Sequence, residues 1–253
     1  MLTLLINLDK SKDRLSSIDQ QLREQDIYYT RISAVYGKEL PEEFVDRIYP
    51  PSNHATYRYP HELSRGEIGC FLSHRECWKT LIQSNEKWGL VLEDDIILSN
   101  NFKKVFDIVK HIPENIHIVQ LHYCDTPVTI SKTKIPLLDN HLIRRIYPAP
   151  MGTHAYLISR EAAQEALAQS ETIDCPVDNF MYGFYHQFSK AFPVFLLEKA
   201  ILKVADEPST ISDRKRDPIY NNLSSKINPI RLSIKLCSKL KKFFGVKFIQ
   251  KYY

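Results

Sequence analysis

Residues 90–100 read LVLEDDIILSN, a stretch with three consecutive carboxylates between two apolar runs. The run WGLVL at residues 88–92 is typical of a buried strand, so Glu93, Asp94 and Asp95 stand where that strand should end. Like charges in a row repel one another, and removing them from water is costly unless something compensates. A bound cation would compensate, and so would a turn that exposes all three side chains to water.

The segments around this stretch alternate between strand and helix patterns. Residues 2–8 (LTLLINL) are apolar enough for a strand buried on both faces, while Ser64 and Glu67 form a capping box that opens a helix. This alternation predicts a single α/β domain with a mostly parallel central sheet flanked by helices. In such sheets ligands bind beyond the carboxyl ends of the strands, where the acidic triplet would lie. The position therefore favours a site over a turn.

The composition is that of an ordinary globular domain and indicates no membrane span. The 253 residues suit one large domain, and no run of 18 uncharged apolar residues predicts a transmembrane helix. The opening MLTLLINLDK lacks the basic region of a signal peptide. The five cysteines are scattered without CxxC spacing, which argues against a disulfide framework or a zinc knuckle and favours a reducing cytosol.

Familiar phosphate-binding and hydrolase motifs are absent from the sequence. There is no GxGxxG, GxxxxGK[ST], HExxH or GxSxG pattern. A hard divalent cation takes one or two carboxylates and completes its shell with water and substrate phosphates. From the residues alone, a cation site and a solvated acidic turn remain equally open for the triplet.

Six motifs follow one another along the chain. They are INLDKSKDR (6–14), AVYGKEL (34–40), LSRGEIGCFLSHRECWK (63–79), LVLEDDIIL (90–98), GTHAYLISREAA (152–163) and PVDNF (176–180). In this order they resemble the bacterial lipopolysaccharide and lipooligosaccharide glycosyltransferases of glycosyltransferase family 25, relatives of the collagen galactosyltransferase domains. The resemblance covers residues 1 to about 212, and six motifs in order are far more specific than any one alone.

The resemblance implies a GT-A-like fold, a UDP-hexose donor and inversion at the anomeric carbon. UDP-galactose is favoured over UDP-glucose as the donor. The acidic triplet takes the place of the DxD signature of such enzymes, so Asp95 is expected to bind Mn²⁺ or Mg²⁺ directly. Asp94 is expected as a second metal contact or a ribose contact, and Glu93 is expected to be structural.

The resemblance also implies roles for residues outside the triplet. Asp178, in PVDNF, is the candidate base that takes the proton of the attacking hydroxyl; its alternative is a favourable charge at a helix N-terminus. For Arg14 a surface ion pair remains open, and for His74 a structural hydrogen bond. Donor contacts are expected from Asn7, Arg14, Ser73, His74, Asp94, Gly152 and Thr153.

Further residues leave the ligand set open. His154 departs from the family pattern, in which a smaller residue follows the Gly-Thr, so the donor and acceptor need not be those of the relatives. His186 and Asp206 are both candidates for an additional metal ligand, and neither is preferred. Gly66 and Gly69 could bring backbone amides close to the sugar or phosphate, although glycines near helix starts often serve packing only.

The C-terminal 36 residues differ in charge from the rest of the chain. After residue 217 there are eight basic and no acidic residues, which leaves 26 basic against 30 acidic residues, about −4, before it. Apolar residues recur at spacings of three and four from residue 227 to residue 248, which predicts a basic amphipathic helix. Residues 1–217 are thus expected to form the glycosyltransferase domain and residues 218–253 a segment that binds an anionic membrane or docks on the domain.

The sequence and the resemblance together predict a transferase that extends the oligosaccharide of a bacterial lipopolysaccharide or lipooligosaccharide. It would be cytoplasmic and peripheral on the inner face of the inner membrane. Its partners would be a nucleotide-sugar donor, a lipid-linked oligosaccharide acceptor and the membrane surface, without nucleic acid. Two alternatives remain: a metal-dependent phosphoesterase or nucleotidyltransferase that uses the same triplet, and a non-catalytic module that binds anionic lipid.

Overall fold

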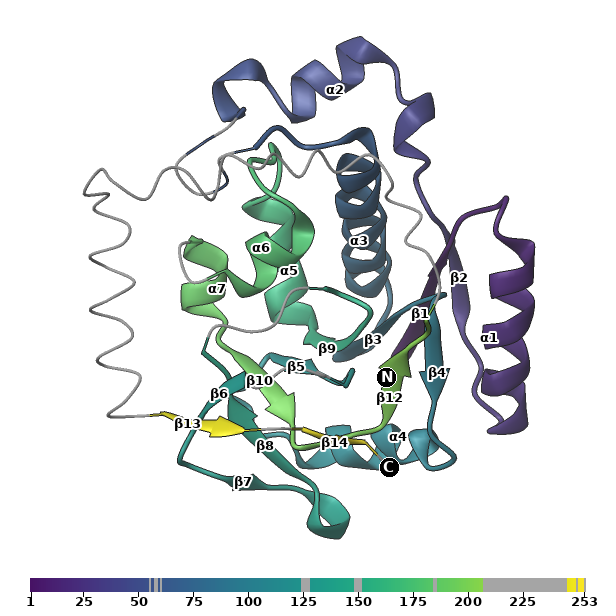
Figure 1. Ribbon diagram of the computed structural model, residues 1–253, viewed down its shortest axis with the longest axis vertical. Helices are drawn as coiled ribbons and strands as arrows, with labels where there is room; N and C mark the ends of the chain where they lie inside the picture. The colour runs from purple at the N-terminus through teal and green to yellow at the C-terminus, as the bar shows by residue number, and fades with distance from the viewer. Residues whose placement is uncertain are drawn as a thin grey trace.

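The computed structural model describes residues 1–54, 56, 59, 61–123, 128–147, 152–183, 186–206, 245–248 and 250–252. Its centre is an eight-stranded sheet in which six strands run one way and only β9 and β8 are reversed (Figure 1). The order across the sheet is β2 (Thr30–Ser33), β1 (Leu2–Asn7), β3 (Trp88–Glu93), β9 (Ala155–Ser159), β5 (Ile118–Gln120), β10 (Val194–Leu197), β8 (Leu142–Arg145) and β7 (Ile135–Pro136).

Helices cover both faces of this sheet because successive strand residues point to opposite sides. In β1, Leu4 and Ile6 belong to one hydrophobic cluster and Leu5 to the other. The first cluster includes residues of α3 (Arg65–Gln83), α5 (Arg160–Ala168), α6 (Val177–Tyr182), α7 (Gln187–Ala191) and α2 (Glu42–Ile48). The second includes residues of α1 (Lys12–Glu24) and α4 (Val105–Ile108). This layering confirms the predicted α/β domain with a mostly parallel sheet flanked by helices.

The long helix α3 begins where the sequence predicts it. The Ser64 side chain accepts a hydrogen bond from the Glu67 amide, and the Glu67 carboxylate accepts one from the Ser64 amide at 2.9 Å, which completes the capping box. Gly69 serves packing: a Cβ there would lie 2.5 Å from the carbonyl oxygen of Val35. The absence of that side chain lets the start of α3 lie against the segment that follows β2.

Three two-stranded pairings complete the described structure. β4 (Ile96–Leu98) pairs with β12 (Leu202–Val204), β6 (Val128–Ser131) with β13 (Gly245–Phe248), and β11 (Lys199–Ala200) with β14 (Lys251–Tyr252). The pairing of β4 with β12 holds the backbone at the acidic triplet, because the Ala205 amide next to β12 donates to the carbonyl of Asp95 at 2.7 Å. Short 3-10 turns connect the elements at Gly37–Glu39, Pro51–Asn53, Phe102–Lys104, Val109–His111 and Leu138–Asn140.

The C-terminal end differs from the helix predicted there. Gly245–Phe248 form a strand antiparallel to β6, and Phe248 packs against the first hydrophobic cluster. Gln250 is buried and donates to the Leu197 carbonyl at 2.7 Å. Gly245 is a poor helix former, and the edge of β6 offers backbone partners that a helix end would lack. The rest of the predicted amphipathic helix, residues 218–244, lies outside the described residues.

Within the described residues, none of the helices combines the length and the apolar character needed to cross a membrane.

Candidate active site

The acidic triplet lies where β3 ends: Glu93 is the last residue of the strand, and Asp94 and Asp95 form the bend before β4. Glu93 and Asp95 lie with His154 so that one ligand atom of each is within 4.8 Å of the others. His154 Nδ1 is 3.2 Å from Asp95 Oδ1 and 3.7 Å from Glu93 Oε2. The backbone holds this arrangement, because the Glu93 amide donates to the His154 carbonyl at 2.8 Å where β3 and β9 run side by side.

A chain of buried hydrogen bonds orients Glu93. The indole of Trp78 can only donate, so it donates to the Tyr156 oxygen at 3.0 Å, and the same hydroxyl forms a hydrogen bond with Nδ1 of His74 at 2.9 Å. Nε2 of His74 then donates to the Thr153 hydroxyl at 3.0 Å, and Thr153 donates to Glu93 at 2.7 Å. This series of hydrogen bonds therefore ends at the Glu93 carboxylate, which accepts the last of them.

Opposite charges hold Glu93 and His154 in their ionised forms. Burial acts to raise the pKa of Glu93, but the hydrogen bond with His74 and the charge of His154 lower it to about 2. Burial acts to lower the pKa of His154, but the hydrogen bond with Asp95 and the charge of Glu93 raise it to about 9. At neutral pH this group of side chains therefore already stabilises one positive charge between two carboxylates.

Asp94 faces the first strand and helix instead. Its carboxylate accepts a hydrogen bond from Asn7 Nδ2 at 2.6 Å and lies 3.5 Å from Nη1 of Arg14. Arg31 in turn donates to the Asn7 side-chain oxygen at 2.9 Å. Burial raises the pKa of Asp94, and its contacts with Asn7 and Arg14 offset only part of that rise. The structure thus brings Asn7, Arg14 and Asp94 together on one side of the triplet.

A pocket opens beside Asp94 at the carboxyl ends of three parallel strands. Ser73 supports its wall, accepting from the Val35 amide at 2.9 Å and donating to the Gly69 carbonyl at 2.7 Å. The wall combines apolar side chains with amide, imidazole and carboxylate groups. The residues that line it are Ile6, Asn7, Leu8, Ala34, Val35, Tyr36, Gly66, Cys70, Ser73, His74, Glu93 and Asp94.

The segment from Gly152 to His154 connects the triplet to Asp178. Asp178 lies in the first turn of α6, is 6% exposed, and accepts hydrogen bonds from the Gly152 amide at 3.1 Å and the Asn179 amide at 2.8 Å. Gly152 has φ of 102°, and a Cβ there would lie 2.8 Å from Nε2 of His154. Only glycine fits this position without strain, so the contact of Asp178 depends on it.

Most of the residues expected at the site lie close together in the structure, and a few do not. The expected donor contacts line the pocket, hold the triplet or contact Asp178, but Asp94 does not lie in the group formed by Asp95, Glu93 and His154. His186, a candidate for the additional metal ligand, lies beside Asp174 at 3.4 Å, and Asp206 is exposed.

Three residues contribute to the site although no sequence pattern marks them as site residues. Arg31 lies in a short strand with an alternating pattern, and its contact with Asn7 depends on the pairing of β1 with β2. Tyr156 and Trp78 belong to apolar runs that predict core packing only. In the structure the Tyr156 hydroxyl forms a hydrogen bond with His74 and accepts one from Trp78. Strand alternation was the one usable signal for the triplet, because it groups Glu93 with Asp95 and sets Asp94 apart.

Replacing Tyr156 with phenylalanine should lower the free energy of unfolding by about 1–3 kcal/mol, because Trp78 Nε1–H and His74 Nδ1 would be left buried without a partner. Chemical denaturation followed by circular dichroism measures this change. The matched control is Tyr28→Phe, since Tyr28 is 92% exposed and its hydroxyl is open to water. Equal stabilities for the two variants would contradict the hydrogen-bond chain.

The chain is similar to several known proteins in sequence and to solved structures in fold. The chain is 28% identical to procollagen galactosyltransferase 2 of Homo sapiens over 86% of its own length but only 38% of that protein. It is 28% identical to a putative glycosyltransferase of Haemophilus influenzae over 62% of its length and 59% of that protein. A solved glycosyltransferase involved in the glycosylation of the major capsid of PBCV-1 aligns with 82% of this chain and 94% of its own, at 9% identity and a TM-score of 0.45.

A family model also matches more than half of the chain. The model described as "Glycosyltransferase family 25 (LPS biosynthesis protein)" matches residues 1–181, which include the acidic triplet, the pocket and Asp178. The chain spans less than two-fifths of the length of the human procollagen galactosyltransferase, so the match concerns this domain and not that whole protein. Because this family model matches residues 1–181, more than half of the chain, the chain belongs to glycosyltransferase family 25.

Proposed function

We propose that this protein is an inverting, metal-assisted glycosyltransferase that moves a hexose from a UDP-sugar to the oligosaccharide of a lipopolysaccharide or lipooligosaccharide acceptor. The observation that carries the proposal is the group formed by Glu93, Asp95 and His154 at the carboxyl end of β3, directly beside the pocket that Asp94 lines. The family description supports the acceptor class, and the relatives named procollagen galactosyltransferases support galactose as the sugar.

The pocket suits the nucleoside part of the donor. Its apolar side chains, among them Ile6 and Val35, can pack against the faces of a planar base. Its polar rim, formed by Asn7, His74 and Asp94, offers groups that can bind ribose hydroxyls. Asp94 is held by Asn7 and Arg14 in one orientation, so a ribose contact would need no rearrangement of its carboxylate.

The residues beside the pocket fit a divalent cation. Glu93, Asp95 and His154 offer two carboxylates and an imidazole whose ligand atoms lie within 4.8 Å of one another, and a bound cation would take the place of the proton that His154 carries at neutral pH. Carboxylates suit Mn²⁺ and Mg²⁺, with Mn²⁺ also accepting imidazole. A bound cation would stabilise the negative charge that develops on the diphosphate as it departs. Hydrogen bonds with Thr153 and His74 fix the orientation of the Glu93 carboxylate.

The proposed reaction is a single displacement with Asp178 as the base. An acceptor hydroxyl oxygen forms a bond to the anomeric carbon while the bond from that carbon to the diphosphate oxygen breaks, which inverts the configuration. The hydroxyl proton passes to the Asp178 carboxylate. The hydrogen bond from the Gly152 amide orients Asp178, and Gly152 is two residues from His154 beside Asp95. The base and the cation site are thereby linked through one short segment.

A donor screen tests the proposal directly. We expect UDP-galactose or UDP-glucose to bind in calorimetry with Mn²⁺ present and to bind at least tenfold more weakly with EDTA. UDP-N-acetylhexosamines and GDP-mannose serve as controls for the sugar and the base. Binding of none of these donors under either condition would overturn the proposal. Hydrolysis of simple phosphate esters without sugar transfer would favour the phosphoesterase alternative instead.

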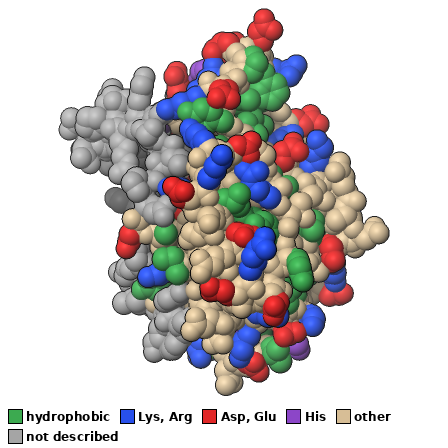
Figure 2. All heavy atoms as spheres, turned by 90° about the vertical axis from the view of Figure 1, so that its right-hand side faces the viewer, with side chains coloured by type: hydrophobic (Ala, Val, Ile, Leu, Met, Phe, Trp, Pro, Cys, Tyr) green, Lys and Arg blue, Asp and Glu red, His purple; other side chains and the backbone are tan. Residues whose placement is uncertain are grey.

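We also propose that the basic C-terminal segment holds the protein at an anionic membrane surface. Residues 218–253 carry eight basic and no acidic residues, while the face around α1 shows acidic and basic side chains interspersed (Figure 2). The attraction to anionic lipid is about 1 kcal/mol per basic residue near the surface. The eight basic residues of this segment would therefore provide most of the binding energy between the protein and the membrane. The pairing of β13 with β6 joins the end of this segment to the domain.

Sedimentation with vesicles tests this second proposal. The protein should sediment with vesicles that contain phosphatidylglycerol and remain in the supernatant with neutral phosphatidylcholine vesicles. Replacing Lys235, Lys239 and Lys242 with glutamate should abolish sedimentation, while the same exchange at the exposed Lys79, Lys87 and Lys110 should not. Equal sedimentation of the two triple variants would contradict a role for the segment.

A further inference from the structure

A second group of metal-ligating side chains lies outside the candidate active site. Asp174 and Cys175 precede α6, and His186 stands directly before α7. The fold brings a carboxylate oxygen, the thiol sulfur and an imidazole nitrogen of these residues within 4.8 Å of one another. The helices α6 and α7 lie side by side (Figure 1), and Phe180 stacks on Phe188 between them at 4.9 Å.

The geometry of this group is that of metal ligands more than of an ion pair. Nε2 of His186 is 3.4 Å from Oδ1 of Asp174, whereas charge-assisted hydrogen bonds are about 2.7–2.9 Å long. Nitrogen and oxygen ligands about 2.0–2.1 Å from a tetrahedral zinc ion are separated by about 3.3 Å. The other ring nitrogen of His186 is buried and has no hydrogen-bond partner among the described residues. Besides the Asp174 carboxylate, the His186 ring contacts Phe180 edge-to-face, with centroids 4.5 Å apart.

Burial and ligand type select the metal. Cys175 is 2% exposed, and the side chains of Asp174 and His186 are 16% and 11% exposed. A thiolate with an imidazole and a carboxylate suits Zn²⁺, whereas Mg²⁺ and Mn²⁺ prefer the oxygen-rich type of set that Glu93 and Asp95 provide. A Cys-His-Asp nucleophile would need contact with a substrate, which the burial of Cys175 prevents.

We propose that Asp174, Cys175 and His186 bind a Zn²⁺ ion that joins the segment before α6 to the segment after it. Three protein ligands leave the fourth tetrahedral position to a water molecule. The helix α6 has only six residues, and so short a helix has little stability of its own. Its first turn carries Asp178, whose carboxylate accepts the hydrogen bond from Gly152. The zinc would thus fix the position of Asp178 from outside the active site, and this inference does not depend on which sugar is moved.

The test is the metal content of the full chain, purified without a histidine tag and dialysed against buffer without metal. We expect stoichiometric zinc by plasma mass spectrometry, and its loss in Cys175→Ala and in His186→Ala. The control is Cys77→Ala, which removes another buried thiol outside this group and should keep its zinc. The variant Asp95→Asn should also keep zinc, which separates this site from the proposed cation site beside the pocket.

A second measurement needs no variant and so does not depend on variants that fold. Zinc is removed with a chelator and replaced by Co²⁺, whose bond to a thiolate gives a charge-transfer absorption. We expect that absorption, together with a rise in melting temperature when either metal is restored. Wild-type protein without zinc, or a Co²⁺ spectrum without the thiolate band, would overturn the proposal. Equal zinc in the wild type and in Cys175→Ala would overturn it as well.

Discussion

Replacing Asp95 with asparagine is expected to lower the rate of sugar transfer about 1,000-fold, which corresponds to about 4 kcal/mol of lost transition-state stabilisation. The change removes one of the two carboxylates in the group that it forms with Glu93 and His154, while the backbone at Asp95 stays fixed by the Ala205 amide. A neutral amide binds a divalent cation far more weakly than a carboxylate does. The metal-dependent part of donor binding in calorimetry should disappear together with the activity.

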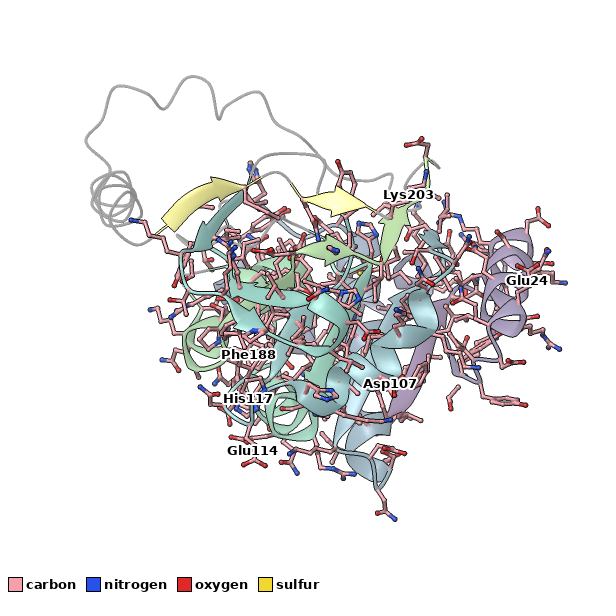
Figure 3. The ribbon with its side chains drawn as sticks, turned by 90° about the horizontal axis from the view of Figure 1, so that it is seen from below. Glu24, Asp107, Glu114, His117, Phe188 and Lys203 are labelled. Atoms are coloured by element: carbon pink, nitrogen blue, oxygen red, sulfur yellow. The ribbon has the colours of Figure 1, made fainter. Side chains whose placement is uncertain are left out.

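The control for this variant is Asp107→Asn. Asp107 is exposed on α4 and forms a surface ion pair with Lys110 at 2.8 Å. In Figure 3 it lies well apart from Lys203 in β12, the strand that pairs with β4 next to the triplet. Its replacement should leave activity unchanged, because exposed ion pairs contribute little. Full activity of Asp95→Asn in the presence of EDTA would show that these carboxylates belong to a solvated turn and do not bind a cation.

Replacing Asp178 with asparagine should lower kcat by about 10²–10⁴-fold while the dissociation constant of the UDP-sugar stays within about threefold of wild type. General-base catalysis acts on the acceptor hydroxyl, so its loss affects the chemical step and not donor binding. The asparagine has the same shape and keeps one oxygen to accept from the Gly152 amide. Single-turnover kinetics with saturating donor measure the step, and calorimetry measures the binding.

The matched control is Asp139→Asn, because Asp139 is an exposed acid with a positive φ of 52° that asparagine tolerates well. It should retain wild-type kcat. A fall in donor affinity and melting temperature for Asp178→Asn, with kcat preserved, would contradict the role as a base. That outcome would assign Asp178 to holding the Gly152–His154 segment, in agreement with the helix N-terminal interpretation of its charge.

Local sequence patterns predicted the elements that depend on local energetics. The apolar run of β1 and the capping box of Ser64 and Glu67 fix a strand and a helix start through interactions within a few residues. The acidic triplet could be placed at the end of β3 because strand ends are marked by a change from apolar to polar residues. The family, too, followed from motifs in order, which need no coordinates.

Contacts between distant segments were beyond the reach of these patterns. Asp94 rather than Glu93 was expected beside Asp95, yet strand alternation and the pairing of β3 with β9 bring His154 and Glu93 to that side. The extended form of Gly245–Phe248 likewise depends on the edge of β6, more than one hundred residues away in the sequence. In both cases the contacts are set by the pairing of strands that are far apart in the sequence, and not by the residues next to them along the chain.

The sequence by itself thus determined the family, the α/β class and the end of the strand where the carboxylates lie. Only the tertiary structure decided which of the three carboxylates lie together, which buried donors orient Glu93, and that Cys175 lies close to His186. The physical reason is that periodicity and capping report interactions between neighbours along the chain. The direction of a side chain at a site depends on burial against strands and helices that are close in space but far apart in sequence.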